Sequence, residues 1–373
     1  GPELLGRNLL IGPRLAGALR RAGVRDVPRI EFVEHHRSHG AAAFYPSPFE
    51  HAAVVTVDGL GEWATASIGW GTQHRLTILE EQRFPNSLGL LYSFVTAWCG
   101  FRPNSDESKI MGLAPYGEAR FGDALASLAG LSDDGSLAVD ARRLDWFGTR
   151  ALARADLHRL LGGPPRRHGE PLRQREADLA ASVQRLTERA LLAMAHRARE
   201  LTGERDLCLG GGVALNGVAN GRVLRDGPFD RVWIQPAAGD AGSAVGAALT
   251  LWHDELGNRR TVERADAMGG ALLGPRESEQ SIIAALDAAH LPSTLFDSDE
   301  DLERHVAARL GRGDVVGWFR GRMEFGPRAL GGRSILADPR SPTVRAHLND
   351  RVKGRESFRP FAPAVLAEHA ADW

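Results

Sequence analysis

The chain contains 373 residues, and its 46 basic and 47 acidic side chains leave a formal net charge of −1. This length suits roughly two domains of about 100–200 residues, and 43% hydrophobic with 25% charged residues argues against a disordered or fibrous protein. Neither an apolar run of the ~20 residues that span a bilayer nor a signal-peptide pattern is present. With only Cys99 and Cys208 as thiols, we expect a cytoplasmic protein without a membrane partner.

Arginine supplies nearly all of the positive charge, since Lys109 and Lys353 are the only lysines. Guanidinium and ammonium groups differ in shape, hydration and pKa. A lysine in such an arginine-rich chain has two interpretations. It either occupies a place where a guanidinium does not fit, or it is an ordinary surface residue.

The first third of the sequence predicts a short helix at 14–23 and then a strand from the alternation Arg29–Glu34, which leads into His35 and His39. Small residues from Gly40 onward favour a helix after the histidines. A meander follows, with a turn at Asp58-Gly59. Its three strands are expected at 53–57, 66–70 and 76–84.

The remainder alternates between strands and helices, which indicates an α/β protein. Its most regular segment is an amphipathic helix at 176–201 that ends at Gly203. Residues 128–172 are typical of a variable insertion. Helices are also expected at 88–99, 106–115 and 278–290, and strands at 206–209, 231–235 and 315–319. The first two of these strands each lead through a glycine-containing turn into a helix, and the second of these helices runs through Leu249.

Histidine and aspartate are placed where a metal could bind. His35 and His39 are four residues apart, a spacing that puts both imidazoles on one face of a helix. Asp58 ends a strand and Asp240 sits in a glycine-flanked loop, so both are candidate oxygen ligands. A zincin protease is unsupported because His36 stands where glutamate is needed. Structural histidines and ordinary turn aspartates remain the alternative.

Two glycine loops each follow a strand and open a helix. Gly210–Asn216 and Gly239–Gly242 let the backbone approach a ligand, and a helix N-terminus favours phosphate. Neither loop is a Walker motif or GxGxxG. Their repetition in successive units suggests one nucleotide cleft, with tight packing as the alternative.

The segment Arg320–Arg359 holds ten basic and four acidic residues, a local net charge of +6 (10 − 4). Arginines interleaved with Gly and Ser can surround a phosphorylated small ligand. Nucleic-acid binding is disfavoured because aromatic residues are sparse and the rest of the chain shows no basic excess. The alternative interpretation is that these arginines form an ordinary charged surface in contact with solvent.

Eight motifs together resemble the O-carbamoyltransferases of antibiotic and nodulation-factor tailoring, over roughly 30–120, 175–250 and 313–366. They are HHRSHGAAAFYPSPF, VDGLGEWATASIG, SLGLLYS, SDESKIMGLAPYG, GGVALNGVANGRV, QPAAGDAGSAVGAAL, FGPRALGGRSILADPR and VKGRESFRPFAP. The resemblance implies an α/β fold in which residues 1–270 form a sugar kinase/actin/Hsp70-like (ASKHA) carbamoyl-transfer domain. Residues 271–373 would then be a linker and the start of a smaller YrdC-like carbamoyladenylate-forming domain, with both chain ends incomplete.

The resemblance also implies chemistry. ATP and carbamoyl phosphate would give carbamoyladenylate, pyrophosphate and phosphate, after which a substrate hydroxyl would attack the carbamoyl carbon and AMP would leave. Iron would be the expected metal, with manganese or zinc as alternatives and Mg as a further companion of ATP. Imidazole and carboxylate ligands suit such ions.

The implied roles fall on matching positions of this sequence. The metal ligands would be His35, His39, Asp58 and Asp240. The adenylate loop would hold Gly211, Gly212 and Asn216. The YrdC-like site would hold Arg328, Arg333, Ser334, Lys353, Arg355 and Arg359. Direct catalytic roles would fall to His39, Asp58, Arg328 and Lys353.

Three rival functions remain open: threonylcarbamoyl transfer to tRNA, an ASKHA-type small-molecule kinase, and a non-catalytic binding remnant. A fused carbamoyladenylate domain and the lack of a general basic surface disfavour tRNA. The two histidines would be unnecessary in a kinase. We therefore expect a small hydroxylated acceptor and no nucleic acid, with a homodimer as one open assembly state.

Overall fold

The computed structural model describes residues 11–144, 146, 151–262 and 265–372. The chain forms two compact units, Gly1–Glu34 and His35–Trp373. Among the described helices, none is long and apolar enough to cross a membrane.

The first unit contains helix α2 (Ile11–Arg21), close to the helix predicted at 14–23. The strand predicted at Arg29–Glu34 is wrong, because this segment has no regular structure. Alternation alone does not make a strand, since its backbone groups need a neighbouring strand to bond. Arg29 and Glu31 instead form an exposed ion pair at 2.6 Å.

The second unit contains every described strand and all other described helices. Its strands are β1 (His51–Gly61), β2 (Ala64–Thr72), β3 (Arg75–Arg83), β4 (Ala129–Leu131), β5 (Leu137–Val139), β6 (Asp206–Gly210), β7 (Arg231–Ile234), β8 (Val316–Phe319) and β9 (Arg333–Leu336). Its α-helices are α3 (His35–Phe44), α4 (Leu88–Trp98), α5 (Glu107–Leu113), α6 (Gly122–Leu128), α7 (Ala155–Leu160), α8 (Gln174–Thr202), α9 (Gly217–Asp226), α10 (Asp240–Thr250), α11 (Glu279–Ala288), α12 (Asp299–Gly311) and α13 (Val344–His347). Shorter 3-10 and π turns are η1 (Ala114–Tyr116), η2 (Ala151–Ala153), η3 (Gly212–Leu215), η4 (Leu251–Glu255), η5 (Gly269–Ala271), η6 (Leu348–Lys353) and η7 (Ala367–Asp372).

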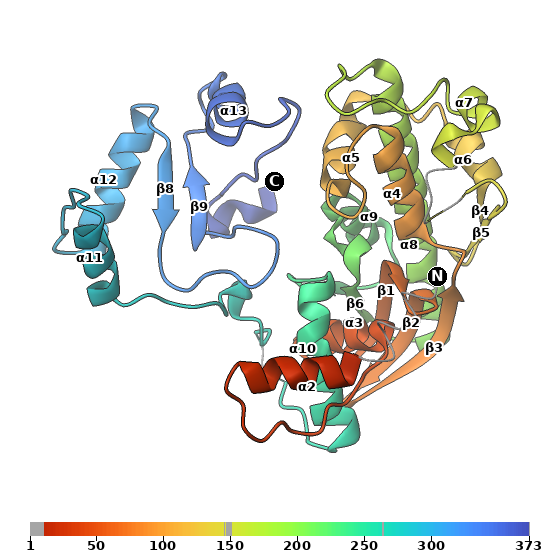
Figure 1. The fold of residues 1–373 in the computed structure, drawn as a ribbon, viewed down its shortest axis with the longest axis horizontal. Helices are drawn as coiled ribbons and strands as arrows, with labels where there is room; N and C mark the ends of the chain where they lie inside the picture. Colours follow the sequence, from red (N-terminus) through yellow and green to blue (C-terminus); the bar gives the residue numbers. More distant parts are fainter. Residues whose placement is uncertain (1–10, 145, 147–150, 263–264, 373) are drawn as a thin grey trace. The chain divides into compact units, whose positions relative to one another are not determined.

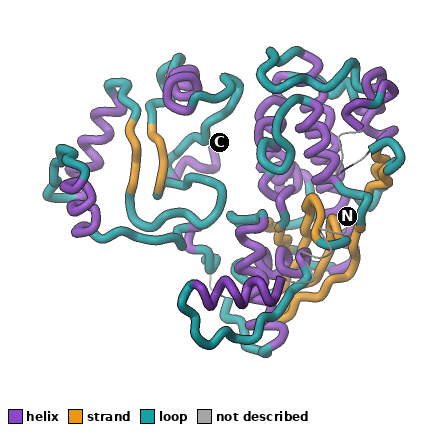
Figure 2. The backbone as a smooth tube through the Cα atoms, in the orientation of Figure 1, coloured by secondary structure: helices purple, strands orange, loops and turns teal. Residues whose placement is uncertain are grey.

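The main sheet has the order β3-β2-β1-β6-β7. The β1–β2 and β2–β3 pairs are antiparallel, as the predicted meander requires, whereas β6 and β7 add in parallel (Figures 1 and 2). Thr56 of β1 pairs with Gly210 of β6. The parallel pairing ends at these two residues, so that Asp58 lies beside the first glycine loop. β1 itself continues to Gly61, and the turn predicted at Asp58-Gly59 is therefore wrong: the β1–β2 register is irregular between Val57 and Gly61, and the hairpin closes after Gly61.

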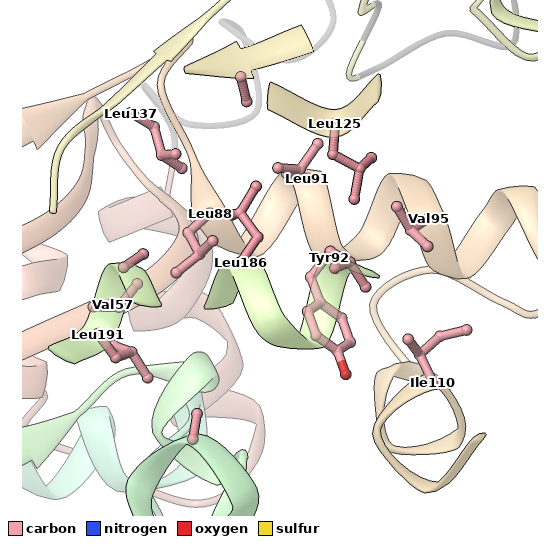
Figure 3. Packing of buried hydrophobic residues seen from close by; sticks show 14 of the residues in the cluster. Val57, Leu88, Leu91, Tyr92, Val95, Ile110, Leu125, Leu137, Leu186 and Leu191 are labelled. Atoms are coloured by element: carbon pink, nitrogen blue, oxygen red, sulfur yellow. The ribbon is translucent and has the colours of Figure 1, made fainter. Parts of the chain in front are cut away.

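Side-chain alternation buries both faces of this sheet. Odd-numbered residues of β1, such as Val55 and Val57, join a large core with α4 and α8; Figure 3 shows Val57 near Leu88, Leu186 and Leu191. Even-numbered residues, such as Val54, join a second core with Phe44 of α3. Helix α8 ends at Gly203 in the left-handed region (φ 69°), as predicted.

The predicted insertion at 128–172 carries the β4–β5 hairpin and α7, and it packs on the large core through Leu144 and Leu157. The C-terminal region from Leu272 onward, called the C-terminal lobe below, contains the antiparallel β8–β9 pair. Helix α12 in this lobe was not predicted, whereas α11 and β8 were. The α/β fold class is confirmed, and the domain boundary at 270/271 stays a prediction.

Candidate metal centre and glycine loops

Helix α3 begins at His35 itself, so the spacing of His35 and His39 does put both rings on one helical face. His39 is 1% exposed, and His35 is half-buried. Gly61 makes room for the His35 ring, because a Cβ at Gly61 would lie 2.3 Å from a ring carbon. Glycine at this hairpin position is therefore a packing requirement of the histidine.

Four side chains from three distant parts of the sequence meet here. The Nε2 atoms of His35 and His39 lie 3.0 Å apart. Asp58 Oδ2 is 2.9 Å from His35 Nε2 and 3.2 Å from His39 Nε2. Asp240 Oδ1 lies 3.7 Å and 3.6 Å from the same nitrogens. All four ligand atoms lie within 4.8 Å of one another.

Asp58 is oriented by both of its oxygens. Oδ2 faces the histidines, while Oδ1 accepts a hydrogen bond of 3.2 Å from the backbone amide of Gly212. Burial acts to raise the pKa of Asp58, yet hydrogen bonds from His35 and His39 outweigh it and hold that pKa well below its ordinary value. Asp58 therefore stays ionised, which suits a ligand better than a proton acceptor.

The geometry fits a divalent ion. Metal–donor bonds of about 2.0–2.2 Å give donor–donor separations of roughly 3.0 Å at right angles and 3.4 Å at tetrahedral angles. The five separations that involve a histidine nitrogen run from 2.9 to 3.7 Å, and all four atoms lie within 4.8 Å of one another. Two imidazole nitrogens 3.0 Å apart cannot both carry protons pointing at each other, whereas a cation between them could take one lone pair from each nitrogen and from each of the two carboxylates. Metal binding by these four residues stays a prediction.

His36 faces the other way and serves the structure. Its Nδ1 is 2.7 Å from Thr56 Oγ1, which in turn is 2.6 Å from Ser67 Oγ. Burial, helped by nearby His39, lowers the pKa of His36 to about 4. A neutral His36 thus ties α3 to the sheet.

The first glycine loop passes close to β1. Gly211 has φ +87°, and a Cβ on it would lie 2.3 Å from Val57 O, so only glycine fits. Asn216 then caps α9 by accepting from Ala219 N at 3.1 Å. Its amide also exchanges two hydrogen bonds, of 2.8 and 3.1 Å, with Gln184 of α8.

Gln184 is a site residue that the motifs did not reveal. It is 4% exposed and also accepts from Tyr92 Oη at 3.0 Å. An amide within the apolar stripe of a long helix was the available signal. Gln184 lines a pocket of about 470 Å³ whose walls are α5, η1, the loop after it, α8 and the start of α9. Glu118, Arg185 and Glu188 supply its charged lining.

The predicted YrdC-like residues fall into two groups. In the first, Glu324 accepts hydrogen bonds from the backbone amides of Leu330, Gly332 and Arg333 at 2.6, 2.7 and 3.3 Å. Burial opposes ionisation, but these amides lower the pKa of Glu324 to about 2. Glu324, which the sequence reasoning missed, thus shapes the loop that carries the predicted arginines.

Around this carboxylate, Arg333 Nη1 donates to Arg320 O at 3.2 Å and its guanidinium covers the Phe319 ring. Ser334 Oγ accepts from Gly331 N at 3.0 Å. Arg328 is exposed and donates to Leu215 O at 3.2 Å, beside Asn216.

In the second group, Arg355 Nε donates to Asn349 Oδ1 at 2.8 Å, and Arg359 Nη2 to Ser108 Oγ at 3.3 Å. Lys353 ends η6 with an exposed side chain. No hydrogen bond or ion pair between described residues joins the two groups. The other lysine, Lys109, pairs with Glu356 at 2.8 Å.

These features agree with the family that the sequence matches. The family model described as "Carbamoyltransferase N-terminus" matches residues 9–249, and that described as "Carbamoyltransferase C-terminus" matches residues 307–373. The chain belongs to the carbamoyltransferase family, which confirms the resemblance seen in the motifs.

Among relatives, an uncharacterized protein of Synechocystis is 50% identical over 94% of this chain and 57% of its own length. The nodulation protein NolO of Bradyrhizobium diazoefficiens is 40% identical over 91% of this chain and 60% of its own. This chain thus spans a little over half the length of these relatives. The crystal structure of T. kodakarensis HypF aligns with 66% of this chain and 39% of its own at 18% identity, with a TM-score of 0.35, too low to define a shared fold.

Proposed function

We propose that the protein is an O-carbamoyltransferase that forms carbamoyladenylate from ATP and carbamoyl phosphate and passes the carbamoyl group to a hydroxyl of a natural product or glycan. One observation carries the proposal: His35, His39, Asp58 and Asp240 converge beside a glycine loop in a chain of the carbamoyltransferase family.

A divalent metal, with iron as our first choice, would be held by these four residues and would neutralise the adenylate phosphate. The chain's own groups supply the rest. The Gly212 amide donates to Asp58 Oδ1 and so orients the carboxylate with its other oxygen toward the histidines. Gly211 lets the loop backbone pack directly against Val57 of β1, and the loop with the helix N-terminus that follows it would bind the adenylate phosphate.

The pocket next to Gln184 is our proposed place for the nucleoside part of the adenylate. It connects to the glycine loop through the paired amides of Gln184 and Asn216. Since these amides already satisfy each other, they would fix the pocket wall rather than change partners when the ligand binds. Preorganised walls of this kind raise the rate by aligning the two reactants.

The transfer step balances without further reagents. The acceptor oxygen bonds to the carbamoyl carbon, the bond from that carbon to the AMP phosphate oxygen breaks, and one proton is released. Stabilising charge on the departing phosphate is the main electrostatic task. In the smaller domain, Arg328 and Lys353 would bind phosphates during adenylation. Both cysteines are unpaired and buried, which suits the cytoplasm.

The test is to incubate the protein with ATP, carbamoyl phosphate and a panel of hydroxylated acceptors and to follow the products. Release of pyrophosphate and AMP, with an acceptor gaining the mass of one carbamoyl group, is the expected result. Release of ADP with a phosphorylated acceptor would instead show a kinase. Modification of tRNA, or ligand binding without turnover, would support the other two rivals.

A further inference from the structure

Among the four candidate ligands, Asp240 is held least directly. Its side chain is 80% exposed. Apart from its approach to the two imidazoles, the described residues offer its carboxylate no hydrogen bond or ion pair. Asp58, by contrast, is fixed by the Gly212 amide. Since Asp240 is the first residue of α10, its position depends on how α10 packs against α3.

Helices α3 and α10 touch backbone to backbone. A Cβ on Gly246 of α10 would lie 1.8 Å from Ser38 O and 2.8 Å from Ala42 N of α3. Because backbone meets backbone here, the contact contains no side chain that could change its conformation to absorb a small displacement. Any rotation or slide of α10 against α3 would therefore move Asp240 relative to His35 and His39.

An ion pair between a half-buried arginine and a buried aspartate links the same two segments a second time. Arg37 lies on α3 midway between the two histidines, and its Nη2 is 3.0 Å from Asp254 Oδ2. Asp254 belongs to the π turn η4, which continues α10, and its side chain is 3% exposed. A π turn shifts the helical register and is frequent at functional sites.

Both carboxylate oxygens of Asp254 accept hydrogen bonds from α3, the residue after it or the sheet. The hydroxyl of Tyr45, which directly follows α3, donates to Asp254 Oδ1, and the Leu76 amide donates to the same oxygen at 3.3 Å. Burial, followed by this bond to Asp254, raises the pKa of Tyr45, so the hydroxyl keeps its proton. A buried carboxylate with three donors is costly to displace.

We infer that Arg37, Asp254 and Tyr45 are positioning residues for the fourth ligand: they lock α10 against α3 and so keep the Asp240 carboxylate at ligand distance. The inference rests on the metal site of the proposed function. None of the three touches the proposed ion. By this inference their effect on metal binding passes through Asp240.

Titration of the protein with Co²⁺, followed by its visible absorption, tests this inference. Arg37→Met, which keeps the aliphatic stem, and Asp254→Asn should each weaken Co²⁺ binding about tenfold, the lower range for residues that orient a ligand. The Co²⁺ spectrum of both variants should shift toward that of Asp240→Ala. Arg37→Lys should restore most of the affinity. Tyr45→Phe, a milder change, should weaken binding by roughly threefold.

A double-mutant cycle separates positioning from a general loss of stability. In the Asp240→Ala background, Arg37→Met should cost no further affinity. Arg231→Met, which removes a surface ion pair with Asp206, is the matched control and should leave Co²⁺ binding unchanged.

Equal losses from Arg37→Met in both backgrounds, or no loss in Arg37→Met and Tyr45→Phe, would overturn the inference while leaving the metal site intact. Absence of Co²⁺ binding in the unaltered protein would overturn the metal site itself.

Discussion

The region from His35 to Ala271, called the larger domain below, and the C-terminal lobe both carry family motifs, but the two regions hold the motif residues in very different packing. In the larger domain, residues as far apart as His35 and Asp240 meet because their elements pack on a sheet whose two faces are both buried. In the lobe, the described residues that are buried beyond Leu272 are Glu324, Gly332, Leu348 and Asn349.

This difference shows that motif residues form a site only where the packing of strands and helices brings their loops together. Asp58 and Gly212 are joined because β1 and β6 are paired strands. Arg328 lies in a loop and Lys353 ends η6, and no hydrogen bond or ion pair between described residues joins these two segments. Within the lobe, Glu324 is the exception, since it organises one basic loop through backbone amides.

The largest effect that we expect falls in the lobe. Arg328→Ala or Lys353→Ala should reduce pyrophosphate release from ATP and carbamoyl phosphate at least about a hundredfold, because each removes a charge from a phosphate in the adenylation step. The metal content should not change, since the ligands lie in the larger domain. Arg312→Ala, an exposed arginine at the end of α12, is the control. Unchanged release in both variants would remove these residues from the adenylation site.

A change at Asn216 should separate the two half-reactions. Asn216→Asp keeps an oxygen to cap α9, so the helix should remain stable. The added charge faces Gln184 Oε1, and by the proposed function also the adenylate phosphate, so carbamoyl transfer to the acceptor should fall about tenfold. Carbamoyladenylate formation should persist. An equal fall in both steps would favour one shared site.

The effect expected at Glu324 is local to one loop and depends on pH. Its folded-state pKa of about 2 lies below the ordinary 4.5, so its stabilisation of the loop is complete above about pH 4.5 and is lost as the pH falls toward 2. In Glu324→Gln, the Leu330 and Gly332 amides should exchange hydrogen roughly tenfold faster at pH 7. This difference from the unaltered protein should shrink by pH 3. A difference independent of pH would show that the charge of Glu324 is irrelevant.

The sequence predicted those features that depend on local pattern. The periodicity of 176–201 and the glycine at 203 describe α8 and its end within a few residues. The three strands of the meander and the two glycine loops also appear where they were expected, but β1 runs past the predicted turn at Asp58-Gly59 to Gly61. The failed strand at Arg29–Glu34 shows the limit of alternation, because a strand exists only when another strand accepts its hydrogen bonds.

The sequence predicted the candidate metal ligands but not the residues that hold those ligands in position. The resemblance supplied His35, His39, Asp58 and Asp240, and the structure brings them together. The Arg37–Asp254 pair spans 217 residues of sequence and obeys no local spacing. Gln184 and Glu324 likewise acquire their roles only from tertiary neighbours.

The central claim is that the four convergent side chains bind a metal, and elemental analysis tests it most directly. The purified protein and His196→Ala, an exposed histidine on α8, should carry iron, manganese or zinc. His39→Ala and Asp240→Ala should each lose at least about tenfold in metal affinity and lose carbamoyl transfer, while pyrophosphate release is largely kept. Full metal occupancy in both variants would contradict the account and return the histidines to a purely structural role.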